Sequence, residues 1–123
     1  MTLIRNLADA KGSPVDAPGA TGCSLAVLIG AADGASNFAV RQVTVEPAGA
    51  TPHHSHDYEH EVIVLEGAGM VLDDGQERAI KPGDVVFVQA GHDHQFRAST
   101  DAPMRFLCVT PTHSASGEAV PGT

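Results

Sequence analysis

The chain has 123 residues, which is the size of one small domain. Apolar residues make up 42% of it and charged residues 18%, and 13 glycines and 8 prolines are present, a composition typical of a compact, turn-rich globule rather than a disordered chain. Fifteen acidic residues against seven basic ones give a formal net charge of −8. No cluster of Lys and Arg could neutralise a run of phosphates, so nucleic acid is excluded as a partner.

No apolar run approaches the roughly 18 residues of a membrane-spanning helix, and the N-terminal residues lack the long apolar segment of a secretory signal. We therefore expect a soluble, cytoplasmic protein without a membrane partner. Cys23 and Cys108 lie 85 positions apart and form no CxxC pair. This spacing predicts free thiols, and neither a disulfide framework nor a thiolate metal site.

Short β-branched or alternating segments follow one another between glycine and proline breakers, and none is long enough for a helix. The expected strands include 25–29, 38–45, 61–65, 69–72, 77–80, 85–88 and 104–109. About eight strands at roughly ten-residue spacing predict an all-β, closed or nearly closed antiparallel barrel or jelly roll.

Two sequences between these strands are typical of tight turns. Asp73-Asp74-Gly75 predicts a hairpin, and Lys81-Pro82-Gly83-Asp84 places proline second and glycine third in a turn. Residues 9–22 and the tail 112–123 have no such pattern. They are expected to be weakly structured flanks, or arms that become ordered on a partner.

The seven histidines are concentrated in two places, with four inside eight residues (His53, His54, His56 and His60) and two further on (His92 and His94). Side chains alternate along a strand, so His54 and His56 are expected to point the same way, about 7 Å apart along the backbone. His60 has the same parity if the strand continues unbroken. A twist or bulge near Asp57-Tyr58 would bring it closer.

His94 lies about thirty residues beyond His60, where an antiparallel barrel could fold its strand back beside the first. The four imidazoles would then form one metal site, since neutral imidazole suits iron, copper, nickel, zinc and manganese. The alternative, surface or hydrogen-bonded histidines, fits four residues at these spacings poorly. His53 has the opposite parity and is set aside. His92 is set aside only if the second strand begins near it, because it shares the parity of His94.

The same residues resemble the two sequence motifs of the cupin superfamily. Gly49, His54, His56, Glu59-His60-Glu61 and Gly67 resemble the first motif, and Gly83-Asp84, Gln89, Gly91 and His94 the second. The chain is similar to a small single-domain bacterial subgroup of four-histidine, manganese-binding cupins. His60 takes the place of the usual glutamate ligand, while Ala48, Gln89 and Ala98 depart from the usual glycine, proline and asparagine.

The resemblance implies one domain over 1–123, a double-stranded β-helix (the cupin jelly-roll barrel) with its core at about 38–110, and a homodimer. Small cupins pair through an outer sheet face or exchange an N-terminal strand, so residues 1–10 are candidates to cross to a neighbour. It also implies one divalent metal ion per chain. The implied ion is manganese first, with iron, copper, nickel or zinc as alternatives, and the implied ligands are His54, His56, His60 and His94.

The catalytic residues are not identified by the sequence, but three candidates have alternative roles. Arg41 is expected either to hold a substrate carboxylate or enolate near the metal, or to form a salt bridge at the barrel mouth or lie exposed at an edge. Cys108 is expected near the metal as a pocket liner or an oxidisable thiol, or else as a small buried hydrophobe. Tyr58 donates a proton, or lies at the rim or a dimer contact. The expected pocket residues are Arg41, Val62, Val64, Phe96, Phe106 and Cys108.

Four imidazoles leave the charge of a divalent ion uncompensated, and an octahedral ion would keep two open positions. This predicts an oxidoreductase, such as a dioxygenase, acting on a small unsaturated or enolic organic substrate. One alternative is a non-catalytic, metal-containing domain that binds or senses a small molecule. The other is a non-redox isomerase or cyclase that uses the metal as a Lewis acid.

Overall fold

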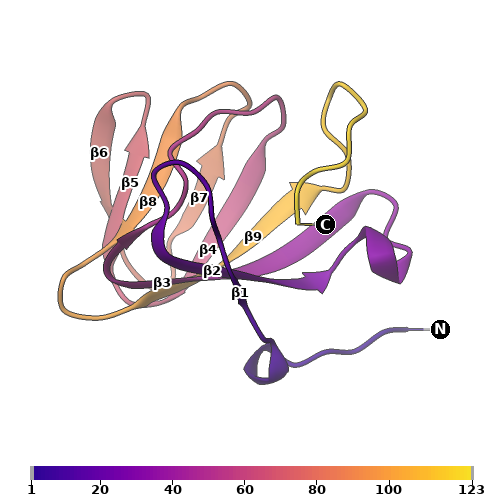
Figure 1. Ribbon diagram of the computed structural model, residues 1–123, viewed down its shortest axis with the longest axis horizontal. Coiled ribbons are helices and arrows are strands. Elements are labelled where there is room, and N and C mark those ends of the chain that lie inside the picture. Colours follow the sequence, from indigo (N-terminus) through magenta and orange to yellow (C-terminus); the bar gives the residue numbers. More distant parts are fainter. Residues whose placement is uncertain (1, 123) are drawn as a thin grey trace.

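The computed structural model describes residues 2–122, and its regular secondary structure consists almost entirely of strands (Figure 1). Its elements are the 3-10 helices η1 (Leu7–Asp9) and η2 (Ala31–Asp33) and the strands β1 (Ser13–Pro14), β2 (Thr21–Ile29), β3 (Phe38–Ala50), β4 (His60–Glu66), β5 (Gly69–Asp73), β6 (Gln76–Ile80), β7 (Val85–Val88), β8 (His94–Ala98) and β9 (Met104–Pro111). The all-β prediction is confirmed. Among the described residues, no helix is long and apolar enough to cross a membrane.

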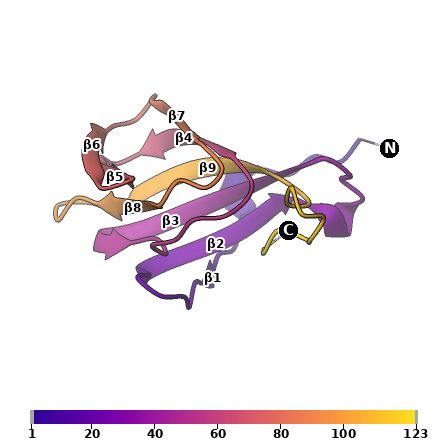
Figure 2. The ribbon, with the colours of Figure 1, turned by 90° about the horizontal axis from the view of Figure 1, so that it is seen from above.

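The strands form one strongly curled antiparallel sheet in the order β6-β5-β8-β3-β9-β4-β7, with β2 beside β3 and β1 beside β2. The long strand β3 pairs with β9 from Phe38↔Pro111 to Val45↔Met104, and its last residue Ala50 pairs with Arg97 of β8. Figure 2 shows the consequence, with β4 to β7 lying opposite β2 and β3 across the barrel.

Both predicted turns are present. Asp74 (φ 46°) and Gly75 (φ 86°) form the two-residue loop between β5 and β6, where two positive φ values match the right-handed twist of a hairpin. The amide of Asp84 donates to the Lys81 carbonyl at 3.1 Å, and Gly83 adopts φ 93° as the third residue of that turn.

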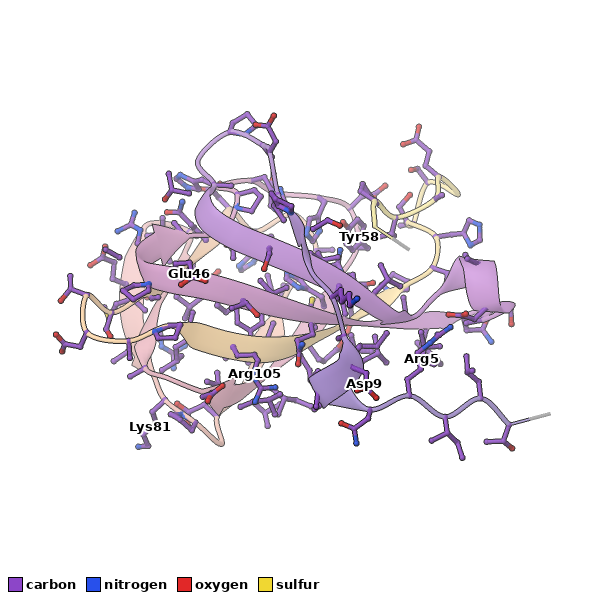
Figure 3. The ribbon with its side chains drawn as sticks, turned by 60° about the horizontal axis from the view of Figure 1, so that its bottom comes forward. Arg5, Asp9, Glu46, Tyr58, Lys81 and Arg105 are labelled. Carbon is purple, nitrogen blue, oxygen red and sulfur yellow. The ribbon has the colours of Figure 1, made fainter. Side chains whose placement is uncertain are left out.

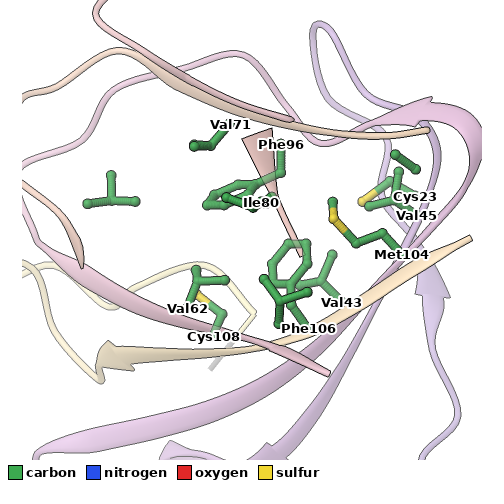
Figure 4. Close-up of a cluster of buried hydrophobic side chains, with 13 residues drawn as sticks. Cys23, Val43, Val45, Val62, Val71, Ile80, Phe96, Met104, Phe106 and Cys108 are labelled. Carbon is green, nitrogen blue, oxygen red and sulfur yellow. The ribbon is translucent and has the colours of Figure 1, made fainter. Parts of the chain in front are cut away.

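The core occupies one part of the barrel interior and follows the period of two along each strand. Phe106 and Cys108 of β9 are both buried, as expected for one face, and Val62 and Val64 of β4 are buried opposite them. The rings of Phe96 and Phe106 pack at a centroid distance of 4.9 Å (Figure 4). These two rings also line the cavity described below, so the core forms the floor of that cavity.

Both flanking segments contact the barrel, in contrast to the weak structure expected from the sequence. Strand β1 pairs with β2, and the Arg5 guanidinium donates two 2.9 Å hydrogen bonds to the Asp33 carboxylate. At the other end Val120 is buried, with 2% of its surface exposed. The C-terminal segment lies on the side of the molecule where Tyr58 is found (Figure 3). Residues with little regular pattern therefore form the rim of the barrel.

Candidate metal centre and cavity

The four predicted ligands come from three places in the fold. His54 lies in the segment between β3 and β4 and forms an isolated antiparallel bridge with His94, the first residue of β8. The amide of His94 donates to the His54 carbonyl at 2.9 Å, and the reverse bond is 3.2 Å. His60 is the first residue of β4. The chain bends at 57–58 instead of continuing as one strand. The expected break near Asp57-Tyr58 is therefore present, and the unbroken strand is not.

The bridge and the bend bring the four rings together. The centroid of the His94 ring lies 4.9 Å from those of His54, His56 and His60. Single ligand atoms of His54, His56 and His94 lie within 4.8 Å of one another, and His60 Nε2 is 3.2 Å from His94 Nε2. The rings therefore gather around one point, which is the arrangement that a single ion requires.

Hydrogen bonds fix the orientation of three rings. His56 Nδ1 donates to the Tyr58 carbonyl at 2.8 Å, and His94 Nδ1 donates to the His92 carbonyl at 2.9 Å, because a carbonyl oxygen can only accept. The unprotonated Nε2 of each ring is then available as a ligand atom. His60 Nδ1 lies 2.9 Å from Cys108 Sγ, which leaves its Nε2 toward His94.

Burial keeps these histidines neutral. It is the largest cause that lowers the pKa of His60 to about 2 and that of His54 to about 4, followed for both by the neighbouring His94 ring. The pKa values of His56 and His94 are also lowered, chiefly by burial. Neutral imidazole is the form that binds metal, so binding near pH 7 would need no proton to leave.

The lowered pKa values predict that the metal-free protein loses stability in mild acid. Histidine titrates near pH 6.5 in the unfolded chain, whereas His54 and His60 titrate lower in the folded protein, so the unfolded chain binds more protons as pH falls below about 6.5. The free energy of unfolding is therefore expected to decrease from about pH 7 to pH 5. Urea unfolding with a chelator present measures it, and His60→Gln is expected to reduce the decrease. Equal stabilities at the two pH values would contradict this account.

The other histidines lie outside the cluster. His53 Nε2 contacts Asp93 Oδ2 at 2.6 Å, as expected from its opposite parity. His92 Nδ1 lies 3.0 Å from Asp73 Oδ1 and forms, with Asp74, a second group of potential ligand atoms at the surface. Sequence reasoning missed this group, although the Asp73-Asp74 turn was recognised, because the contact depends on the pairing of β5 with β8.

A cavity of about 760 Å³ opens beside the histidine cluster. Its walls are largely apolar and include Val15, Leu25, Val43, Phe96 and Phe106. Four of the six expected pocket residues line it: Arg41, Phe96, Phe106 and Cys108. Val62 and Val64 also face inward, but they are buried in the core and do not reach the cavity.

Both flanks complete this cavity, which sequence reasoning did not predict. Ser13 to Val15 of the N-terminal flank line it, as do Ser114, Glu118, Ala119 and 121–122 of the C-terminal flank. Pro14 and Pro121 were among the few available signals in these segments without periodicity, because proline restricts the backbone and adds a rigid apolar surface.

The three candidate catalytic residues all line the cavity. Arg41 Nη2 donates to Cys108 Sγ at 3.4 Å and Nη1 to the Pro121 carbonyl at 3.1 Å. Among the described residues it forms no salt bridge with a carboxylate. The half-buried Tyr58 ring stacks on His56 at 3.7 Å. Burial raises the pKa of the Tyr58 phenol, which therefore remains a proton donor at neutral pH.

Both thiols are expected to react slowly in the folded protein. Burial raises the pKa of Cys23 to about 11 and also raises that of Cys108, so little reactive thiolate exists near pH 8. Alkylation by iodoacetamide, followed by mass spectrometry, is expected to be at least about tenfold slower than in urea. Native alkylation of Cys108 at the unfolded rate would contradict this prediction.

Comparison with known proteins identifies the class of protein to which this chain belongs. Residues 41–110 match the Cupin_2 family model, described as a cupin domain. This match covers more than half of the chain, so the protein belongs to the cupin domain family.

Individual relatives carry several different names. The polyketide cyclase RemF from Streptomyces resistomycificus is 33% identical with a TM-score of 0.86, over 98% of this chain and 86% of that chain. A 1-methylthio-D-xylulose 5-phosphate methylsulfurylase from Rhodospirillum rubrum is 33% identical over 57% of this chain and 45% of its own length. An oxalate-binding protein from Thermotoga maritima is 30% identical over 55% of this chain and 57% of its own length. The chain thus spans about half the length of these two curated relatives.

Proposed function

We propose that the protein is a metal-dependent enzyme that catalyses a cyclisation or isomerisation of a largely apolar organic substrate. The ligands of the ion are His54, His56, His60 and His94. The observation that carries the proposal is that four neutral imidazoles meet at the wall of an apolar cavity. A divalent ion bound there would act as a Lewis acid on a carbonyl or enol oxygen.

The donor set fits such an ion. It contains four imidazoles. In three of the rings Nδ1 contacts a carbonyl oxygen or the Cys108 sulfur, and this contact leaves Nε2 free to face the ion. Manganese is the first expectation from the family resemblance, and iron, copper, nickel and zinc suit the same nitrogen ligands.

The chain itself would bind, orient and protonate the substrate. The floor of Phe96 and Phe106 holds apolar rings and excludes water from the reacting oxygen. The Tyr58 hydroxyl, protonated at neutral pH, is the candidate proton donor. A cavity of about 760 Å³ is suited to a substrate of drug size, larger than a simple dicarboxylate.

Similarity to a polyketide cyclase over nearly the full length of both chains favours ring closure over the oxidative chemistry expected from the sequence. Dioxygenase activity and binding without turnover are the two competing outcomes. The experiment offers 1,3-diketones, enols and polyketone chains to zinc-loaded and manganese-loaded protein, with and without oxygen, and identifies products by mass spectrometry.

Products isomeric with the substrate, or lighter by one water, that form with zinc under anaerobic conditions are the expected result. His94→Ala is expected to form none. Activity that requires oxygen and is lost with zinc would instead indicate a dioxygenase. Saturable binding without product would indicate a sensing domain.

We further propose that the protein is a homodimer. Val85 and Phe87 on β7 and Phe38 on β3 are exposed apolar side chains, with 71%, 56% and 69% of their surfaces accessible. Such side chains support association through an outer face of the sheet. Light scattering during size exclusion is expected to give twice the mass of one chain, and a monomer mass would contradict the proposal.

A further inference from the structure

The cavity contains one strongly basic side chain among the described residues, that of Arg41. It lies on β3, where its register partner is Cys108 of β9, so it faces the barrel interior. Its positive charge contributes to the lowered pKa of His54, His56 and His60, which places it within electrostatic reach of the cluster.

The guanidinium of Arg41 is poorly satisfied. Arg5, Arg97 and Arg105 each donate to a carboxylate at 2.8 to 2.9 Å. Arg41 donates instead to a backbone carbonyl and to a thiol sulfur, and its buried Nε has no acceptor among the described residues. Sulfur is a weak acceptor, and an arginine in an apolar cavity ordinarily pairs with an anion. The group therefore lacks its usual partner.

We propose that Arg41 anchors an acidic oxygen of the ligand, which defines the ligand class as an apolar, ring-bearing molecule with a carboxylate, enolate or phenolate group. This inference rests on the proposed function in assigning the cavity to substrate. The Pro121 carbonyl and the Cys108 sulfur each take one Nη hydrogen of Arg41, and each Nη nitrogen carries a second hydrogen that can donate to a ligand oxygen.

Two carboxylates also line the cavity, those of Asp57 and Glu118. Asp57 Oδ2 accepts from the amide of Ser116 at 3.2 Å, and neither carboxylate pairs with Arg41. Their negative charge weakens the binding of anions in this cavity, so an acidic ligand needs a positively charged partner, and Arg41 supplies one.

Two probes of the same shape test the anchor, 2-naphthoate and its neutral counterpart 2-naphthamide. Dissociation constants are measured by calorimetry for the metal-free and zinc-loaded protein. The wild type is expected to bind 2-naphthoate at least about tenfold more tightly in both states, as for a charge-assisted hydrogen bond. In the metal-free protein, Arg41→Gln is expected to abolish this preference and to leave 2-naphthamide binding unchanged. Arg97→Gln, which alters an exposed arginine outside the cavity, is expected to behave as the wild type.

If 2-naphthoate is preferred only with zinc, and Arg41→Gln keeps that preference, the metal ion and not Arg41 binds the carboxylate. This result would overturn the role of Arg41 and leave the metal proposal unchanged. Equal binding of the two probes by the wild type would also overturn it. If Arg41→Gln does not fold, phenylglyoxal modification of the wild type gives the answer. 2-Naphthoate is then expected to protect Arg41 more than 2-naphthamide does, and equal protection would contradict the proposal.

Discussion

Replacement of His94 by alanine is expected to reduce the affinity for a divalent metal ion by more than about 100-fold. Loss of a hydrogen-bond partner behind a ligand alone costs about 10–100-fold, and His94 is itself central to the cluster. Its ring lies 4.9 Å from each of the other three and its Nε2 is 3.2 Å from that of His60. Calorimetric titration with zinc or manganese measures the change.

His113→Ala is the matched control for this measurement. His113 lies in the C-terminal segment and contacts Thr112 Oγ1 at 3.3 Å, outside the cluster of four rings. Its replacement is expected to leave metal affinity unchanged. Equal losses in the two variants, or undiminished binding by His94→Ala, would show that metal binds elsewhere.

Gly67→Ala is expected to destabilise the protein far more than Gly75→Ala. Both glycines adopt positive φ, 75° and 86°, so an alanine at either position costs about 1–2 kcal/mol of backbone strain. A Cβ at Gly67 would overlap the Pro103 carbonyl and lie 2.9 Å from Met104 Cα, whereas nothing lies within 4 Å of a Cβ at Gly75. The clash at Gly67 involves backbone and adds about 1–3 kcal/mol.

Urea unfolding of the two variants measures this difference directly, because the backbone strain is common to both. The Gly67→Ala variant is expected to have the lower midpoint, with the excess loss arising where the chain from β4 passes the beginning of β9. Equal losses of stability would mean that the close approach of Pro103 to Gly67 is absent in solution.

The strands and the common direction of the His54 and His56 side chains could be predicted because both follow from the period of two along a strand. The common face of Phe106 and Cys108 is an example, as is the hairpin at Asp74-Gly75. The return of His94 beside His54 followed from counting turns between them. The period of a strand, the turn residues and the number of turns between strands were sufficient in these cases.

What the sequence could not predict depends on long-range pairing. The contact of His60 Nδ1 with Cys108 Sγ requires the register of β4 on β9, in which Val62 pairs with Cys108. The position of Val62 in the core rather than at the cavity depends on the same register. The C-terminal flank reaches the cavity through contacts such as that of the Arg41 guanidinium with the Pro121 carbonyl, for which no sequence period exists.

Anomalous diffraction from crystals grown with zinc or manganese would show whether the four imidazoles bind one ion. We expect one strong anomalous peak per chain, at bonding distance from Nε2 of His56, His60 and His94 and from a ring nitrogen of His54. A peak confined to the surface group of Asp73, Asp74 and His92, or no peak inside the barrel, would contradict it.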